Sequence, residues 1–114
     1  FVIEDAYPEN FDPKDIRAAL DQCAAVYDEN ADQNAWFDTI KAVSEGLGFA
    51  PDVKLYKQEP EKYKGSVADV CMFLRVAVTG KLNSPDMYAV MQVLGRDKVI
   101  ARLQAMSTRL ANGQ

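Results

Sequence analysis

The fold is decided by residues 66–103, which read SVADVCMFLRVAVTGKLNSPDMYAVMQVLGRDKVIARL. The first part predicts a helix that begins after Ser66, a suitable N-cap, and ends before Gly80. Glycine is favoured just past a helix end because it readily takes the left-handed backbone conformation. Apolar residues occupy nearly every face of this helix, so we expect the rest of the chain to surround most of it.

Two more helices are predicted from the same stretch. Ser84 is the expected N-cap of the first, Pro85 its first residue and Gly95 its end, because proline already has the backbone angle of a first helical position. The second follows directly and runs to about Ala111. Its inner stripe is apolar at helical spacing: Val99, Leu103, Met106 and Leu110.

Two further helices are expected upstream. Asp12 is the N-cap of a helix over residues 13–27, and Asp32 is the N-cap of a helix over residues 33–47. One face of the second helix is apolar: Trp36, Ile40, Val43 and Leu47.

The remaining segments lack helical periodicity. Residues 1–11 read as an extended lead-in, and residues 49–65 read as a long ordered loop with one short turn at 60–63. We therefore expect a single all-α domain, residues 1–114, with about five helices around one core. The chain does not begin with Met, and we expect it to be a fragment of a longer protein.

Composition excludes several classes of protein. The chain has no histidine, so it cannot form a Ser-His or Cys-His pair or a metal site that contains histidine, and we assign no catalytic or metal-binding residue. Its two cysteines are too sparse for a disulfide scaffold. No apolar run is long enough to cross a membrane and no signal peptide is evident, so we expect a cytoplasmic protein.

Charge is distributed unevenly along the chain. Residues 1–53 hold twelve acidic and three basic residues, whereas residues 54–114 hold five acidic and ten basic residues. The overall charge of −4 argues against a nucleic-acid partner, but a basic half can present one face to an anionic partner.

Arg75 lies in the middle of the apolar helix and has two interpretations. It can form a core ion pair or extend out of the core, or it can present its guanidinium group to a base edge or a phosphate. Four other basic residues also have two interpretations. They can belong to an ordinary solvated surface, or they can bind phosphates. The candidates are Lys81 in the turn, together with Lys98, Arg102 and Arg109, which lie within about 40° of one another around the last helix.

Residues 74–103 resemble the C-terminal signature of bacterial-type glutamyl-tRNA synthetases, class I enzymes, and of clostridial members most closely. The shared pattern is Leu-Arg-x-Ala-x-Thr-Gly, then Ser-Pro, an apolar helix, Leu-Gly-Arg and Arg-Leu. The resemblance implies an all-α cage that grips the anticodon loop of tRNA(Glu). By position, Arg75 would read an anticodon base, Ser84 and Pro85 would lie against the bases, and Met87 would pack on the same nucleotides. Many members have a proline where this chain has Phe73.

The resemblance also implies a parent enzyme that joins glutamate to tRNA with ATP and Mg²⁺. The catalytic domain would belong to the same chain, and its motifs are missing here, so this fragment should be inactive and bind no cofactor. Two alternatives stay open at this point: a non-discriminating synthetase that also charges tRNA(Gln), and a helical protein-interaction module without RNA binding.

Overall fold

The computed structural model describes residues 11–80 and 86–112, and these residues confirm the all-α prediction. They form six helices: α1 (Pro13–Val26), α2 (Gln33–Gly46), α3 (Val53–Gln58), α4 (Val67–Thr79), α5 (Met87–Leu94) and α6 (Arg96–Ala111). None of these helices is both long and apolar enough to span a membrane.

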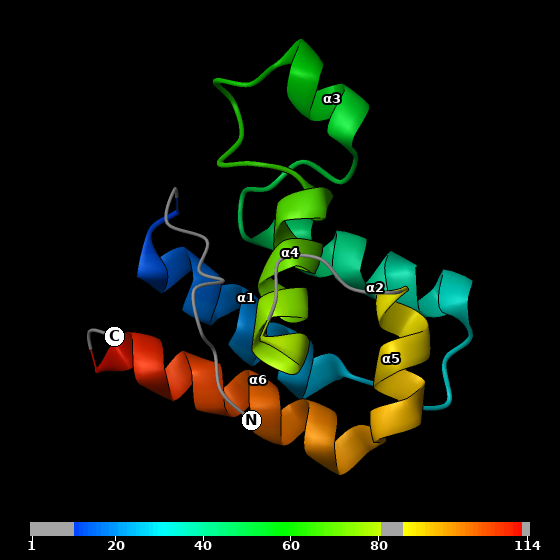
Figure 1. The fold of residues 1–114 in the computed structure, drawn as a ribbon. Helices are drawn as coiled ribbons and strands as arrows, with labels where there is room; N and C mark the ends of the chain where they lie inside the picture. Colours follow the sequence, from blue (N-terminus) through cyan, green and yellow to red (C-terminus); the bar gives the residue numbers. More distant parts are fainter. Residues whose placement is uncertain (1–10, 81–85, 113–114) are drawn as a thin grey trace.

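α4 is the central helix, and four others pack around it (Figure 1). α1 and α6 lie side by side and form the most extensive helix pair, while α2 and α5 lie on the other side of α4. Seven of the thirteen residues of α4 are buried, as its sequence predicted: Val67, Val70, Phe73, Leu74, Val76, Ala77 and Val78.

Both ends of α4 have the predicted chemistry. Ser66 and Asp69 form a reciprocal capping box, in which the Ser66 backbone N–H donates to Asp69 Oδ2 at 2.8 Å. Gly80 ends the helix with φ 74°, in the left-handed region where a side chain would be strained. Local sequence therefore fixes the length of the helix that carries Arg75.

The upstream helices also begin where their caps predict. Asp12 Oδ1 accepts from the Lys14 backbone N–H at 2.9 Å, and Asp32 Oδ1 accepts from that of Ala35 at 2.8 Å. α1 and α2 each end one residue earlier than expected. The predicted inner face of α2 is buried at three positions and half-buried at Leu47: the buried residues are Trp36, Ile40 and Val43.

The segment 49–65 differs from the prediction of a loop, because it contains the helix α3. Asp52 caps this helix by accepting from the Leu55 backbone N–H at 2.6 Å. α3 buries none of its residues, so it carries no apolar period that sequence analysis could detect. Figure 1 shows that α3 stands apart from the other helices.

The base of this excursion is tied to the core. The Ala50 backbone N–H donates to Gly65 O at 2.9 Å, and that of Val67 donates to Ala50 O at 2.8 Å. Three phenylalanine rings pack beside it: Phe73 makes edge-on contacts with Phe11 at 5.0 Å and with Phe49 at 5.9 Å between ring centres.

α5 begins at Met87, two residues later than the sequence suggested, and Asp86 occupies the N-cap position. The predicted cap Ser84 and first residue Pro85 lie outside the described residues. α6 has the predicted bounds and the predicted buried face: Val99, Leu103, Met106 and Leu110.

Candidate nucleic-acid interface

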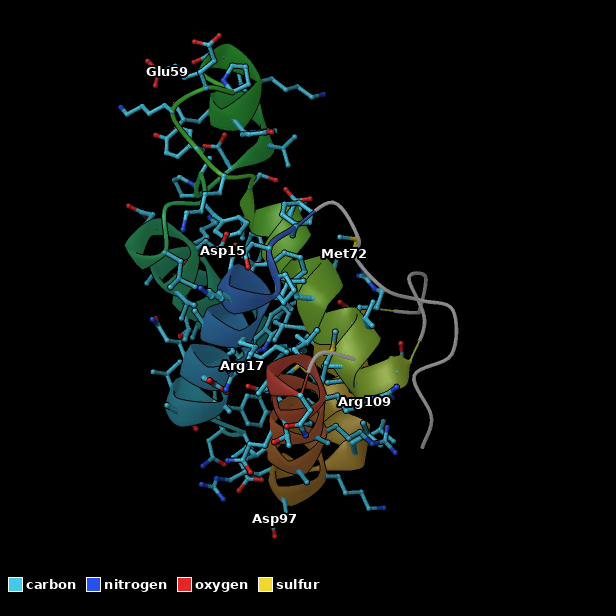
Figure 2. All side chains as sticks on the ribbon, turned by 90° about the vertical axis from the view of Figure 1, so that its left-hand side faces the viewer. Asp15, Arg17, Glu59, Met72, Asp97 and Arg109 are labelled. Carbon is cyan, nitrogen blue, oxygen red and sulfur yellow. The ribbon has the colours of Figure 1, made fainter. Side chains whose placement is uncertain are left out.

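α4 is covered by neighbouring helices except along one narrow stripe. The half-buried residues of its body recur at helical spacing: Cys71, Met72, Arg75 and Thr79. Met72 is labelled on α4 in Figure 2. Arg75 therefore lies on the open stripe and not inside the core, while the adjacent Leu74 and Val76 are fully buried and hold its backbone in place.

A pocket of about 360 Å³ lies beside this stripe, between α2, α4 and the start of α5. This volume is within the range of small-molecule sites in proteins, about 300–1,000 Å³. The described residues that line it come from all three helices and the α5 cap: Gln33, Asn34, Trp36, Phe37, Cys71, Arg75, Asp86 and Met87. The structure thus brings together Arg75 and Met87, two of the four residues expected to bind the anticodon.

Contacts between α2 and α5 fix the shape of the pocket. Gln33 Nε2 donates to Asp86 Oδ2 at 3.3 Å, which joins the first turn of α2 to the cap of α5. Tyr88 OH donates to Ala31 O at 2.7 Å, and the Tyr88 ring lies 5.9 Å from that of Trp36. The buried Trp36 ring in turn stacks on Phe37, with 6.4 Å between ring centres.

The other predicted site residues lie elsewhere or are not described. Ser84, Pro85 and Lys81 fall outside the described residues. Lys98 and Arg109 are exposed on α6, and neither lines the pocket beside Arg75. Figure 2 labels Arg109 near the end of α6 and Asp97, the residue before Lys98, near its start.

Arg102, the remaining phosphate-contact candidate on α6, is half-buried and bonds another helix. Its Nη1 donates to Val78 O at 2.7 Å, next to the C-terminal end of α4. A cation at this end is favoured because the last carbonyl groups of a helix carry partial negative charge. Arg102 therefore joins α6 to α4.

Sequence analysis did not identify the pocket residues of α2 or the residues next to the expected contacts. Cys71 precedes Arg75 by four positions, so helical spacing places both on one face. Asp86 is the residue before Met87 and the N-cap of α5, so its position next to an expected contact is its only sequence signal. Asn34 and Phe37 carry no such signal, because their place depends on how α2 packs against α4.

The two cysteine thiols are free, and burial changes their acidity. The pKa of Cys23 is raised to about 12, mainly because the thiol is buried. The nearby Cys71 raises this pKa further. Burial also raises the pKa of Cys71 to about 11, although the Arg75 guanidinium group partly opposes this change. Both thiols are therefore protonated at neutral pH, and neither is a ready nucleophile.

This acidity predicts that stability declines at alkaline pH. The unfolded thiols lose their protons near the ordinary pKa of 9.0, whereas the folded ones retain them to about 11 and 12. The thiol contribution to stability is thus fully present below about pH 9 and is lost as the pH rises through the folded pKa values. The urea concentration at the midpoint of unfolding should fall as the pH is raised from neutral to alkaline. The fall should be smaller in the Cys23→Ala variant, which lacks one of the two thiols. An equal fall in both proteins would contradict this assignment.

Comparison with known proteins agrees with the fold. Residues 53–107 match the sequence model of a family described as an anticodon binding domain. The chain is 39% identical to a glutamate–tRNA ligase of Acetivibrio thermocellus. This match extends over 93% of the chain and over 19% of that ligase. The chain is 44% identical to a glutamate–tRNA ligase of Sorangium cellulosum over 85% of its length, and 36% identical to one of Clostridium perfringens strain 13 over 84% of its length. These two matches cover 17% and 18% of the relatives. No solved structure matches.

The helical fold and the match of residues 53–107 indicate the class of anticodon-binding domains. Its relatives place it, more particularly, with the C-terminal anticodon-binding region of glutamate–tRNA ligases, as the resemblance of residues 74–103 predicted. The chain spans about a fifth of the length of the relatives that it matches.

Proposed function

We propose that this chain recognises the anticodon loop of tRNA(Glu) as one domain, residues 1–114, of a cytoplasmic glutamate–tRNA ligase. The remainder of that enzyme would attach glutamate to the tRNA and would bind the ATP and Mg²⁺ that the reaction uses. The observation that carries the proposal is the position of Arg75, on the open stripe of α4 and beside a pocket that Met87 also lines.

The chemistry of this position suits an unpaired base. Proteins read RNA sequence mainly on single-stranded loops, whose unstacked bases offer a flat surface and a hydrogen-bonding edge. Arginine presents a rigid fork of N–H donors to such an edge. Met87 also lines this pocket and, because it is only 3% exposed, offers a small apolar surface there. Arg75 would therefore bond the edge of an anticodon base while Met87 packs against the nucleotide.

Residues 81–85 and two exposed basic residues of α6 complete the proposed interface. By the resemblance, Ser84 and Pro85 would lie against the bases, and the basic residue Lys81 would contact a phosphate. Lys98 and Arg109 are exposed and would contact phosphates of the stem. Since Arg102 already bonds Val78 O, we expect it to contribute less to RNA affinity than the other two α6 residues.

Salt dependence separates RNA binding from the alternative of a protein-interaction module. Phosphate contacts release bound counterions, so added salt weakens them steeply. We expect the dissociation constant for a tRNA(Glu) anticodon stem–loop to rise about tenfold or more between about 50 mM and about 200 mM salt. Fluorescence anisotropy of a labelled stem–loop measures this change.

The matched variants for that titration replace exposed basic residues. A double variant, Lys98→Ala with Arg109→Ala, should reduce the salt dependence, because two phosphate contacts are lost. Lys14→Ala removes an exposed lysine from α1 and should leave the salt dependence unchanged. Binding that does not respond to salt would favour apolar docking of a protein partner instead.

A further inference from the structure

The pocket beside Arg75 has a third wall, which α2 provides and which the family signature does not include. Asn34 contributes an exposed carboxamide and Phe37 a half-buried ring. Asp86 lies at the start of α5 and places a carboxylate at the same pocket. The lining thus combines two aromatic side chains, two amides, one positive group and one negative group.

We propose that this pocket holds one nucleobase of the bound RNA, stacked on Phe37 and bonded along its edge by Asn34. The inference rests on the proposed anticodon recognition and adds α2 to the interface. Arg75 and Met87 would contact the same nucleotide from α4 and α5.

The charges of the lining favour a neutral, flat ligand. Arg75 and Asp86 place one charge of each sign at the pocket, so the attraction of either one for a free ion is offset by repulsion from the other. A nucleobase is uncharged and carries donors and acceptors along one edge. The Asn34 carboxamide also offers both a donor and an acceptor, so it can pair with such an edge.

The aromatic ring adds affinity that depends little on base identity. Every base has a flat π-face that can stack on an aromatic side chain, so this contact contributes affinity for any base. Lys41 Nζ lies over one face of the Phe37 ring, 4.9 Å from the ring centre. A base held by this wall would therefore stack on the opposite face of the ring.

The α2 wall is also held in place without RNA. Trp36 is 8% exposed, lines the pocket beside Phe37 and stacks on its ring. The bond from Gln33 to Asp86 fixes the first turn of α2 against the cap of α5. A wall fixed in this way loses little side-chain freedom when a base binds, which favours affinity.

The chain contains a built-in reporter for this pocket, because Trp36 is its only tryptophan and lines the pocket. The experiment follows Trp36 emission and the anisotropy of a labelled tRNA(Glu) anticodon stem–loop in parallel titrations. We expect the emission to change in proportion to bound RNA. Phe37→Leu should weaken binding about tenfold and Asn34→Ala about fivefold, from the size of stacking and base-edge contacts.

Matched variants make the result specific to the α2 wall. Tyr56→Leu removes a half-buried aromatic ring from α3, and Gln104→Ala removes an exposed carboxamide from α6. Neither residue lines the pocket, so both variants should bind as the wild type does. Thermal unfolding of every variant confirms that it is folded before it is titrated.

Arg75→Ala separates the two proposals. If it weakens binding while Phe37→Leu and Asn34→Ala bind normally and Trp36 emission stays constant, the α2 wall is excluded and anticodon recognition stands. If the wild-type chain does not bind the stem–loop, or Arg75→Ala has no effect on binding, anticodon recognition through Arg75 fails and the inference fails with it.

Discussion

Phe73→Ala is expected to lower the free energy of unfolding by about 3–5 kcal/mol, as is usual when a buried phenylalanine is truncated. Phe73 is fully buried in the central helix and contacts the rings of Phe11 and Phe49 at 5.0 and 5.9 Å. The substitution leaves a cavity where the N-terminal approach to α1, the base of the α3 excursion and α4 meet. Urea unfolding followed by circular dichroism measures the loss.

Met72→Ala provides the matched control for this prediction. Met72 is the preceding residue of the same helix but lies half-buried on its open stripe, so its truncation creates no enclosed cavity. We expect its cost to be below about 1 kcal/mol, as for most substitutions near the surface. Equal losses in the two variants would mean that the Met72 face of α4 is as enclosed as the Phe73 face, which contradicts the open stripe.

The second large effect concerns recognition and not stability. In a full-length ligase that carries this region, Arg75→Ala should cost about 1–3 kcal/mol of discrimination between anticodons, the value of a good bidentate base contact. The loss should be specific because Arg75 is at the pocket edge and its backbone is fixed between buried neighbours. Charging of tRNA(Glu) and of its anticodon variants measures this discrimination.

Two further variants test whether the guanidinium fork of Arg75, and not its charge alone, provides the discrimination between anticodons. Arg75→Lys keeps the charge but loses the fork of donors, so it should recover affinity for RNA better than discrimination between anticodons. Arg96→Ala removes an exposed arginine whose ion-pair partner is Asp97 at 3.3 Å, and it should leave discrimination unchanged. Anticodon preference that survives Arg75→Ala would exclude Arg75 as the reading residue.

The parts of the fold that sequence predicted are those set by local chemistry. Ser66, Gly80 and Gly95 mark helix ends through their own backbone and side-chain properties, and the structure has ends at these positions. The inner faces of α2 and α6 follow from apolar spacing alone. The composition of α4 likewise predicted a surrounded helix, and its burial confirms this.

The parts that sequence did not predict depend on packing or on its absence. α3 has an ordinary cap in Asp52 but buries no residue, so no periodicity marks it. The exposure of Arg75 follows from which face of α4 its neighbours leave uncovered. Asn34 and Phe37 belong to the pocket only because α2 packs beside α4, and no short sequence pattern records such an arrangement.

Recognition of an anticodon through Arg75 is tested most directly by one binding measurement. The chain and its Arg75→Ala variant are titrated with the tRNA(Glu) anticodon stem–loop and with a stem–loop whose anticodon bases are changed, at low and at high salt. We expect the wild type to prefer the tRNA(Glu) loop, and the variant to lose this preference while its binding stays sensitive to salt. Equal affinity of the wild type for both loops, or an unchanged preference in the variant, would contradict recognition through Arg75.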